Sequence, residues 1–349
     1  MTSSPQTPDR DQQDLRWMKR ALDIASTVRL QTSPNPWVGC VLVTAAGEVF
    51  DGATEPPGGR HAEIVALDAA RRAGAEVRGA TMYTTLEPCS HHGRTGPCTE
   101  AIVEAGVSRL VSALADPDSQ VNGNGFRVLR GAGIAVEVGI GDEAASEQLQ
   151  PYLHHRRTGR PFVVLKTACT LDGRTAAPDG SSQWITGDEA RRAVHRLRAE
   201  SDAIVVGAGT VRSDDPSLTT RLVDGPSPRR VVLGTAPPSA RVHPCLEWNG
   251  DLGDLLDTLG GDGVLQLMVE GGAKVAASFH RQDLVDRYVF HMAPALMGGD
   301  GAPVFDGRGA STMKDLWRGR VRSTRALGDD LEIVLDRYVT SPEQHEDLT

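Results

Sequence analysis

A histidine and a glutamate two residues apart, His61 and Glu63, precede two cysteines, Cys89 and Cys98, which have eight residues between them. One imidazole and two thiolates fill three of the four tetrahedral positions around Zn²⁺. The open fourth position can hold a water molecule, whose pKa the metal lowers toward neutrality. Glu63 is not needed as a ligand, and from the helical turn after His61 it can transfer the proton of that water. The spacing therefore predicts an open, catalytic zinc site.

The cysteine at position 89 follows Thr85-Leu86-Glu87-Pro88. The spacing His-x-Glu, then Pro-Cys and a second Cys, is typical of zinc-dependent deaminases, in which the glutamate passes a proton to the leaving amine. Ordinary buried thiols and a core histidine are the alternative for any one of these residues, but the combination disfavours it. His91 and His92 remain alternative ligands by spacing. They rank lower because His61, Cys89 and Cys98 already complete an open site.

Composition limits the class of protein. The 349 residues suffice for two domains, and 39% hydrophobic residues suffice for packed cores. A net charge of −9 disfavours binding to nucleic acid and favours a small-molecule substrate. Residues 1–13 are polar and lack an apolar signal core, so we expect a disordered leader and no export. The sequence also has no apolar run of about eighteen residues, so we expect no contact with a membrane. Five cysteines, an odd number, suit a reducing cytoplasm.

Strands and helices alternate in the first half of the chain. Apolar spacing predicts helices over 15–28, 61–73, 97–105 and 126–132, and strands over 38–43, 80–85, 109–113 and 135–138. Such alternation predicts a sheet covered by helices on both faces, a three-layer α/β domain over 14–145. The metal-binding residues then lie at helix starts beside strand ends.

The pattern changes near residue 146 and begins again near residue 161. A helix over 143–155 followed by the basic, turn-like segment 154–159 predicts a linker over 146–160, in which His154 and His155 are solvated rather than metal ligands. A second α/β domain is expected over 161–340, with a tail over 341–349. Its expected strands cover 162–167, 203–206, 231–233, 264–269, 288–292 and 331–335, and its expected helices 186–199, opened by a capping box at Thr186, and 274–280.

Two glycine-rich segments in the second half could bind phosphate. Gly207-Ala208-Gly209 follows a strand, but Arg212 occupies the third glycine position, so the Rossmann fingerprint fails. Glu270-Gly271-Gly272-Ala273 joins a strand to a helix, a corner whose free N–H groups suit a phosphate. Paired glycines are also common in plain turns.

Longer motifs resemble a known family, the bifunctional riboflavin-biosynthesis deaminase/reductases. Its deaminase half is matched by Cys-Ser-His-His-Gly-Arg-Thr-Gly-Pro-Cys at 89–98 and by Pro-Asn-Pro-Trp-Val-Gly at 34–39. Its reductase half is matched, in order, by Lys166-Thr167-Ala168, Leu171-Asp172-Gly173-Arg174, Ser182-Gln183-Trp184-Ile185-Thr186, Gly207 with Thr210, Asp214-Asp215-Pro216, Leu218-Thr219 with Arg221, Val269-Glu270-Gly271-Gly272 and Pro294-Ala295-Leu296-Met297-Gly298-Gly299. The resemblance extends from about Leu15 to Asp336.

The resemblance implies two consecutive reactions with Zn²⁺ and NADPH as cofactors. A cytidine-deaminase-like domain would deaminate 2,5-diamino-6-ribosylamino-4(3H)-pyrimidinone 5′-phosphate. A dihydrofolate-reductase-like α/β domain would then reduce the ribosyl group to a ribityl chain. That fold binds a nicotinamide without a Rossmann fingerprint. The resemblance also implies a homo-oligomer, a dimer or tetramer associated through the reductase half.

Roles carried over from the family fall on numbered residues of this chain. Zinc ligands would be His61, Cys89 and Cys98, with Glu63 as the proton shuttle. NADPH would contact Ala168, Trp184, Thr210, Asp214, Thr235, Gly272, Ala273, Lys274, Val275, Ala276, Ala277 and Ser278, although the chain around Thr235 is shorter than is usual in the family. Substrate would contact Asn35, Lys166, Ser182, Arg198, Leu218, Arg221 and Glu270. A surface position at a strand end is the alternative for Lys166.

Two positions in the deaminase half depart from the family pattern. Thr54 occupies a position where the family often has histidine, and Asn124 one where it usually has a basic residue. The second change removes a cation that could hold a substrate phosphate. One alternative is therefore a reductase whose first domain has drifted or lost activity. Another is a non-catalytic ligand sensor or scaffold with a structural zinc, which Glu63 argues against because a closed site needs no proton shuttle.

Overall fold

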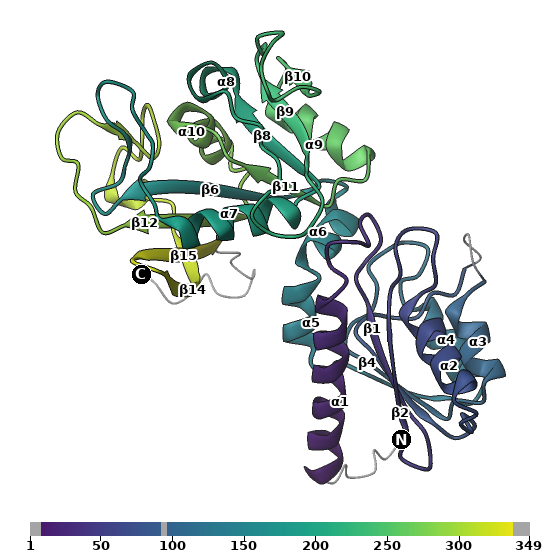
Figure 1. The fold of residues 1–349 in the computed structure, drawn as a ribbon. Helices are drawn as coiled ribbons and strands as arrows, with labels where there is room; N and C mark the ends of the chain where they lie inside the picture. The colour runs from purple at the N-terminus through teal and green to yellow at the C-terminus, as the bar shows by residue number, and fades with distance from the viewer. Residues whose placement is uncertain (1–7, 92–95, 338–349) are drawn as a thin grey trace. The chain divides into compact units, whose positions relative to one another are not determined.

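The computed structural model describes residues 8–91 and 96–337 (Figure 1). The chain divides into two compact units, Met1–Gly159 and Arg160–Thr349. The division falls inside the segment 146–160 that the sequence predicts as a linker. The expected tail, 341–349, lies outside the described residues. No helix in the described part of the chain is long and apolar enough to cross a bilayer.

The first unit is built on a five-stranded mixed sheet in the order β2-β1-β3-β4-β5. β3, β4 and β5 run parallel, whereas β1 is antiparallel to both of its neighbours. The strands are β1 (Gly39–Val43), β2 (Val49–Ala53), β3 (Thr81–Thr84), β4 (Arg109–Ser112) and β5 (Ala135–Val138). The carboxyl ends of the parallel strands share one edge, and Cys89 follows β3 at that edge.

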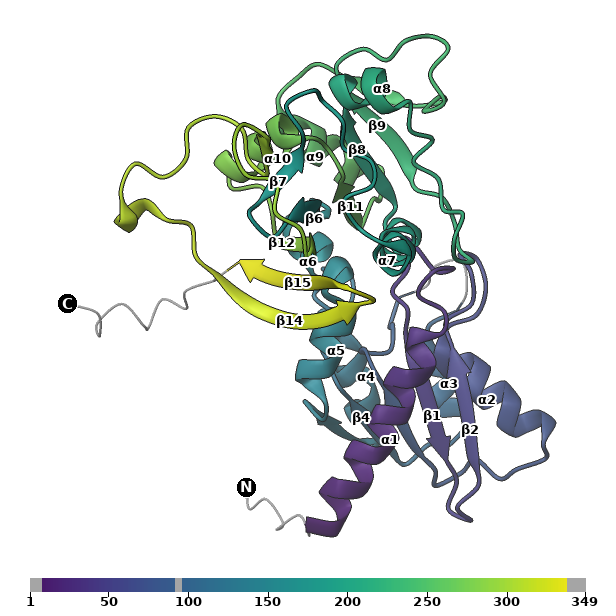
Figure 2. The ribbon, with the colours of Figure 1, turned by 60° about the vertical axis from the view of Figure 1, so that its left-hand side comes forward.

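Helices cover both faces of this sheet (Figure 1, Figure 2). Residues from α1 (Pro8–Ser26) and α5 (Asp142–Gln148) pack with Val41, Tyr83 and Val111 on one face. The opposite layer contains α2 (Ala62–Arg72), α3 (Cys98–Glu104) and α4 (Asn124–Gly131). Helix α6 (Gln150–Thr158) completes the unit. The predicted three-layer α/β architecture is confirmed.

Two predicted irregular segments are helical. Residues 8–13, placed by the sequence in a disordered leader over 1–13, form the first turns of α1, while residues 1–7 lie outside the described part. The predicted linker 146–160 contains the end of α5 and all of α6. Leu149, Tyr152 and Leu153 are buried there, so α6 is part of the first unit. Its basic neighbours concealed this apolar face in the sequence.

The second unit contains an eight-stranded sheet in the order β10-β9-β8-β11-β6-β12-β15-β14. The strands from β10 to β12 are parallel, and β15 and β14 extend the sheet antiparallel. The strands are β6 (Phe162–Thr170), β8 (Ala203–Gly207), β9 (Arg229–Leu233), β10 (Leu246–Trp248), β11 (Gln266–Val269), β12 (Arg287–Ala293), β14 (Gly319–Leu327) and β15 (Asp330–Arg337). A separate pair joins β7 (Arg174–Ala176) to β13 (Ala302–Pro303).

This sheet is also covered on both faces. Apolar residues of α9 (Leu252–Gly261) and α10 (Ala273–Arg281) form one core with Val163, Val205 and Val269. On the other face, α7 (Asp188–Ala199) and α8 (Ala208–Asp214) contribute to a second core. A short 3₁₀ helix spans Met313–Asp315.

The expected capping box at Thr186 is wrong, because the N-cap residue of α7 is Gly187, whose N–H donates to the Asp330 carboxylate instead.

Candidate functional sites

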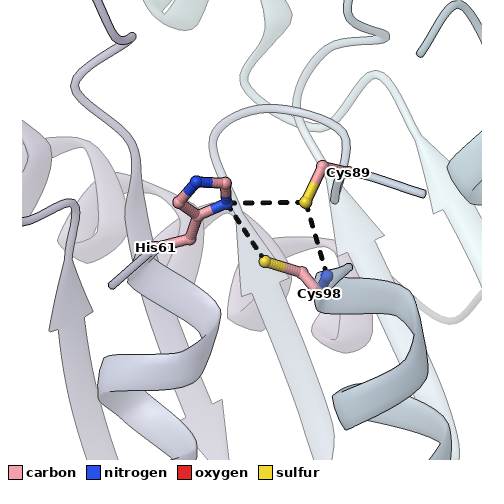
Figure 3. Close-up of side chains that lie close together, drawn as sticks. All are labelled: His61, Cys89 and Cys98. Atoms are coloured by element: carbon pink, nitrogen blue, oxygen red, sulfur yellow. Dashed lines mark hydrogen bonds between the residues drawn. The ribbon is translucent and has the colours of Figure 1, made fainter. Parts of the chain in front are cut away.

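Three predicted ligands meet at one end of the first unit (Figure 3). His61 is the N-cap residue of α2, Cys98 begins α3, and Cys89 lies in the loop after β3. The Nδ1 atom of His61 lies 3.5 Å from Cys89 Sγ and 3.3 Å from Cys98 Sγ. Tetrahedral zinc with ordinary bond lengths holds a nitrogen and a sulfur ligand about 3.5 Å apart. The three donor atoms therefore fit Zn²⁺.

Of the two histidines between the cysteines, His91 can be compared with this cluster in the described structure. His91 lines the adjoining pocket, but the group of possible metal donors contains only His61, Cys89 and Cys98 among the described residues. His92 lies outside the described residues. The structure thus favours the ligand set that the sequence ranked first.

Glu63 lies in the first turn of α2, is 3% exposed, and lines the same pocket. Burial raises the pKa of its carboxyl group to about 7. The neighbouring Cys98 thiol, with His61, lowers the pKa of Cys89, which favours the thiolate that metals bind. The carboxyl group of Glu63 thus shares one pocket with two of the predicted metal ligands, His61 and Cys89.

The pocket beside these residues has a volume of about 490 Å³ and includes Asn35. Thr54, which replaces the family's histidine, also lines it, and its Oγ1 accepts a hydrogen bond from the Val38 N–H at 3.1 Å. Asn124 is not among the lining residues; its side-chain oxygen accepts a hydrogen bond from Arg127. The two departures are therefore not equivalent, because only Thr54 borders the pocket.

A buried carboxylate holds the cysteine loop against α4. Glu87 accepts hydrogen bonds from the backbone N–H groups of Asp116, Gly123, Gly125 and Phe126. Two of these donors belong to the first turn of α4, where a negative charge also interacts favourably with the helix dipole. Glu87 thereby fixes the chain two residues before Cys89.

A second pocket, of about 760 Å³, lies within the second unit. It brings together most of the residues predicted to contact NADPH or the reductase substrate: Lys166, Ala168, Ser182, Trp184, Arg198, Thr210, Asp214, Leu218, Arg221, Glu270, Gly272 and Ala273. These residues come from β6, α7, α8, α10 and the loops between elements. The sequence motifs thus converge on one cavity.

A charged triad lies in this pocket. Arg198 donates two hydrogen bonds to the Glu270 carboxylate, from Nε and Nη2, each at 2.9 Å. Lys166 is 8% exposed, and burial lowers the pKa of its amine. Burial opposes ionisation of Glu270, yet Arg198 and Lys166 together hold the pKa of that carboxyl below its usual value. Lys166 is therefore a buried pocket residue, and not the surface lysine considered as the alternative.

Other predicted cofactor contacts do not reach this pocket. Thr235 is exposed, and Lys274, Val275, Ala276, Ala277 and Ser278 are absent from the lining. Ala276 and Ala277 are 2% and 1% exposed because the inward side of α10 packs in the core. Of the predicted contacts from Gly272 to Ser278, only Gly272 and Ala273 line the cavity, as expected where a helix presents its first N–H groups.

Several pocket residues escaped the sequence analysis. In the first pocket they are Asp116, Asp118, Tyr152 and Arg156; in the second they include Arg191, His195 and Arg241. The segment Asp116-Pro117-Asp118 follows the carboxyl end of β4, an edge where ligands commonly bind, so its position was a usable signal. Tyr152 and Arg156 are four residues apart on one helix, a spacing that also places them on one face.

The fold and the two pockets define a class of protein: an enzyme with a zinc-dependent deaminase domain followed by a reductase domain. Residues 11–114 match the family model of the cytidine and deoxycytidylate deaminase zinc-binding region, and residues 161–333 match that of the RibD C-terminal domain.

Whole-chain relatives agree with this order of domains. The chain is 41% identical over 338 residues to riboflavin biosynthesis protein RibD of Mycobacterium tuberculosis (strain ATCC 25618 / H37Rv), covering 91% of this chain and 96% of the relative. It is 36% identical over 362 residues to the protein of the same name from Escherichia coli (strain K12), covering 91% and 98%. The chain belongs to the RibD family of bifunctional riboflavin biosynthesis enzymes.

Solved structures lead to the same conclusion. Acinetobacter baumannii RibD (form 1) superposes with a TM-score of 0.88 at 34% identity, covering 94% of this chain and 100% of that chain. A second solved structure is the diaminohydroxyphosphoribosylaminopyrimidine deaminase/5-amino-6-(5-phosphoribosylamino)uracil reductase of Thermotoga maritima. It superposes with a TM-score of 0.87 at 32% identity, covering 94% of this chain and 100% of that chain. The expected fold, two enzymatic domains, and Zn²⁺ and NADPH as cofactors are confirmed, and the deaminase domain is present rather than drifted.

Proposed function

We propose that the first unit hydrolytically deaminates 2,5-diamino-6-ribosylamino-4(3H)-pyrimidinone 5′-phosphate and that the second reduces the ribosyl group of the product with NADPH. The observation that carries the first step is the cluster of His61, Cys89 and Cys98 at a pocket that buried Glu63 also lines. The name of the Thermotoga maritima relative, a deaminase and a reductase of phosphoribosylaminopyrimidines, supports the substrate.

In the deaminase pocket, His61, Cys89 and Cys98 would hold the zinc. The metal, when bound, supplies an acidified water. Glu63 takes a proton at its carboxylate and delivers it to the leaving amine, for which its place in the turn after His61 is suited. The Asn35 amide, which offers both a donor and an acceptor, binds the pyrimidine edge from the pocket wall.

In the reductase pocket, bound NADPH supplies the hydride. Of the residues that line this pocket, we assign to the cofactor Ala168, Trp184, Thr210, Asp214, Gly272 and Ala273. We assign to the substrate Lys166, Ser182, Arg198, Leu218, Arg221 and Glu270. Arg198 is held in place by Glu270, and with Arg221 it presents cationic donors to the ribose phosphate. These groups position the two reactants, which is what hydride transfer needs most.

We also infer a cytoplasmic homo-oligomer, a dimer or tetramer. Val321 on β14 and Leu331 on β15 are 58% and 40% exposed, and apolar side chains on the last strands of a sheet favour association through the reductase unit. The Cys89 and Cys98 thiols must stay reduced to bind metal, which suits the cytoplasm. Light scattering of the purified chain measures the oligomer directly.

The decisive test is ammonia release from the diaminopyrimidinone substrate by zinc-loaded protein, with NADPH omitted. Omission of the reductant separates the first reaction from the second. We expect stoichiometric ammonia, which would also show that Thr54 supports the reaction. If zinc-loaded protein released none, the first unit would need a different substrate, and only the reductase assignment would stand.

A further inference from the structure

The described lining of the deaminase pocket offers little positive charge to a phosphorylated substrate. Its described lining contains four carboxylates, Glu63, Glu87, Asp116 and Asp118, but among the described residues it contains a single arginine and no lysine. That arginine is Arg156, on α6 of the same unit. A phosphate dianion entering an acidic pocket requires a cation. The position that usually provides one in this family holds Asn124, whose side chain is not in the lining.

Contacts with three neighbouring residues hold Arg156 in place at the pocket. Its guanidinium carbon lies 4.9 Å from the centre of the Tyr152 ring, a cation–π contact. Its Nε lies 3.2 Å from the Asp118 carboxylate, and its Nη1 lies 3.1 Å from His155 Nδ1. The Nε atom is nevertheless buried without a hydrogen bond of good geometry. The guanidinium group is thus oriented by its neighbours while part of its donor capacity is unused.

The acidic neighbours of Arg156 are largely engaged in other interactions. Glu87 is occupied by four backbone N–H groups. Asp116 accepts hydrogen bonds from the Tyr152 hydroxyl at 3.0 Å and from the Asp118 N–H at 2.9 Å, and burial raises the pKa of its carboxyl group. Asp118 also accepts the Gln120 N–H at 3.0 Å. These interactions reduce the repulsion that an incoming phosphate would meet beside Arg156.

We infer that Arg156 binds the 5′-phosphate of the deaminase substrate, in the place of the basic residue absent at position 124. This inference rests on the proposed deaminase function. The planar guanidinium group can donate two parallel hydrogen bonds to phosphate oxygens, which a lysine cannot do. Tyr152 and Asp118 act as positioning residues, because they fix the plane of the guanidinium group. The phosphate then anchors the substrate from α6 while its pyrimidine ring faces Glu63.

The test compares two substrates and three variants of the full chain. The substrates are the 5′-phosphate and its dephosphorylated ribosylamino counterpart; the variants are Arg156→Met, Arg156→Lys and Arg157→Met, each assayed for ammonia release. Loss of a charge-assisted contact predicts a KM about 10- to 100-fold higher for Arg156→Met with the phosphorylated substrate, and a nearly unchanged kcat. The KM of Arg156→Lys should fall between those of the wild type and Arg156→Met. Arg157 is exposed, is adjacent on the same helix and does not line the pocket, so Arg157→Met should match the wild type.

The dephosphorylated substrate separates phosphate binding from a structural role. With it, wild type and Arg156→Met should have the same KM, since no phosphate is present to bind. An equal loss with both substrates, or an unchanged KM with the phosphorylated one, would overturn the assignment of Arg156 while leaving the deaminase function intact. Ammonia from neither substrate with zinc-loaded wild type would instead overturn the proposed function, and this inference with it. Zinc content and NADPH oxidation of each variant verify its folding.

Discussion

At the scale of single residues, the strongest prediction concerns Glu63. Replacing it with glutamine keeps the size of the side chain and removes the group that exchanges protons. Glu63→Gln should retain one zinc per chain, because His61, Cys89 and Cys98 are untouched. Its ammonia release should fall by about 10²- to 10⁴-fold, the usual contribution of a general acid–base group. Metal analysis and an ammonia assay on the same sample measure both quantities.

The second unit provides the internal control for that variant. NADPH oxidation with the deaminated uracil as substrate should equal that of the wild type, since the reductase pocket lies entirely within residues 160–349. Ammonia release that persisted in Glu63→Gln would mean that a different group carries the proton.

Spacing in the sequence could predict those site residues that lie close together along the chain. His61 and Glu63 share a helical turn, so their pattern alone placed them together. Asp116 and Arg156 reach the same pocket from separate elements, and no local pattern connects them. Family resemblance assigned Ala276 and Ala277 to NADPH, but it could not tell which side of α10 packs in the core.

At the scale of elements, the contact between the cysteine loop and α4 predicts a sensitive glycine. A Cβ atom added at Gly125 would lie 2.1 Å from the carbonyl oxygen of Pro88, which is the residue before Cys89. Gly125→Ala should therefore displace the loop, cost about 1–3 kcal/mol, and weaken zinc binding by roughly 10-fold or more. Competition with a chromogenic chelator measures the zinc affinity.

Gly131, at the other end of α4, is the matched control. A Cβ atom there would meet no heavy atom within 4 Å. Gly131→Ala should leave the zinc affinity unchanged and increase the free energy of unfolding by up to about 1 kcal/mol, the helix preference of alanine over glycine. Equal zinc affinities in the two variants would contradict the proposed role of the close contact at Gly125.

A buried ion pair joins α1 to the sheet and predicts a pH dependence of stability. Arg109 donates hydrogen bonds to the Asp14 carboxylate at 2.6 and 2.8 Å, and the Tyr83 hydroxyl donates another at 2.7 Å. Burial opposes ionisation of Asp14, but these donors keep the pKa of its carboxyl below the usual 3.8. Asp14→Asn should lower the free energy of unfolding near pH 6 by about 3 kcal/mol, because it leaves Arg109 only partly compensated.

The sign of the pH effect follows from the lowered pKa. The stabilisation from Asp14 is complete above the unfolded-state pKa and is lost as the pH falls through the folded-state pKa. The difference between wild type and Asp14→Asn, measured by urea unfolding, should therefore be constant above about pH 5 and shrink below about pH 4. Asp23→Asn, an exposed site on the same helix, should stay within about 0.5 kcal/mol of wild type throughout. A pH-independent difference for Asp14→Asn would contradict the ionic origin of this contact.

Element prediction succeeded for the continuous apolar strands β8 and β11, but it missed α9 despite the buried leucines of that helix. It missed β14, whose residues are mostly exposed and polar, because that strand forms through pairing with β15 rather than by burying its own side chains. It missed the start of α1 because residues 8–13 are polar and lie on the N-terminal turns of a helix anchored further along by Met18 and Ala21.

At the scale of the whole molecule, the order of motifs was enough to predict two domains with different chemistry. Each unit has its own sheet and its own core, and the described lining residues of each pocket belong to one unit. From the sequence, the boundary between the two domains could be placed only to within about one helix. Helix α6 ends in basic residues, which resemble a linker, but it also has a buried face. Its contribution of Tyr152 and Arg156 to the first pocket makes the segment part of the deaminase rather than a spacer.

Separate pockets predict that removal of the metal affects one reaction only. All three zinc donors lie in Met1–Gly159, whereas the lining of the reductase pocket lies in Arg160–Thr349. Dialysis of the full chain against a strong chelator should abolish ammonia release and leave the rate of NADPH oxidation with the deaminated uracil within about twofold of the untreated protein. Added Zn²⁺ should restore ammonia release. The reciprocal variant, Arg198→Leu, should retain ammonia release and lose NADPH oxidation, because the Glu270 carboxylate loses the guanidinium group that holds it. A parallel loss of both activities on chelation would show that the first unit supports the second reaction, and would contradict their independence.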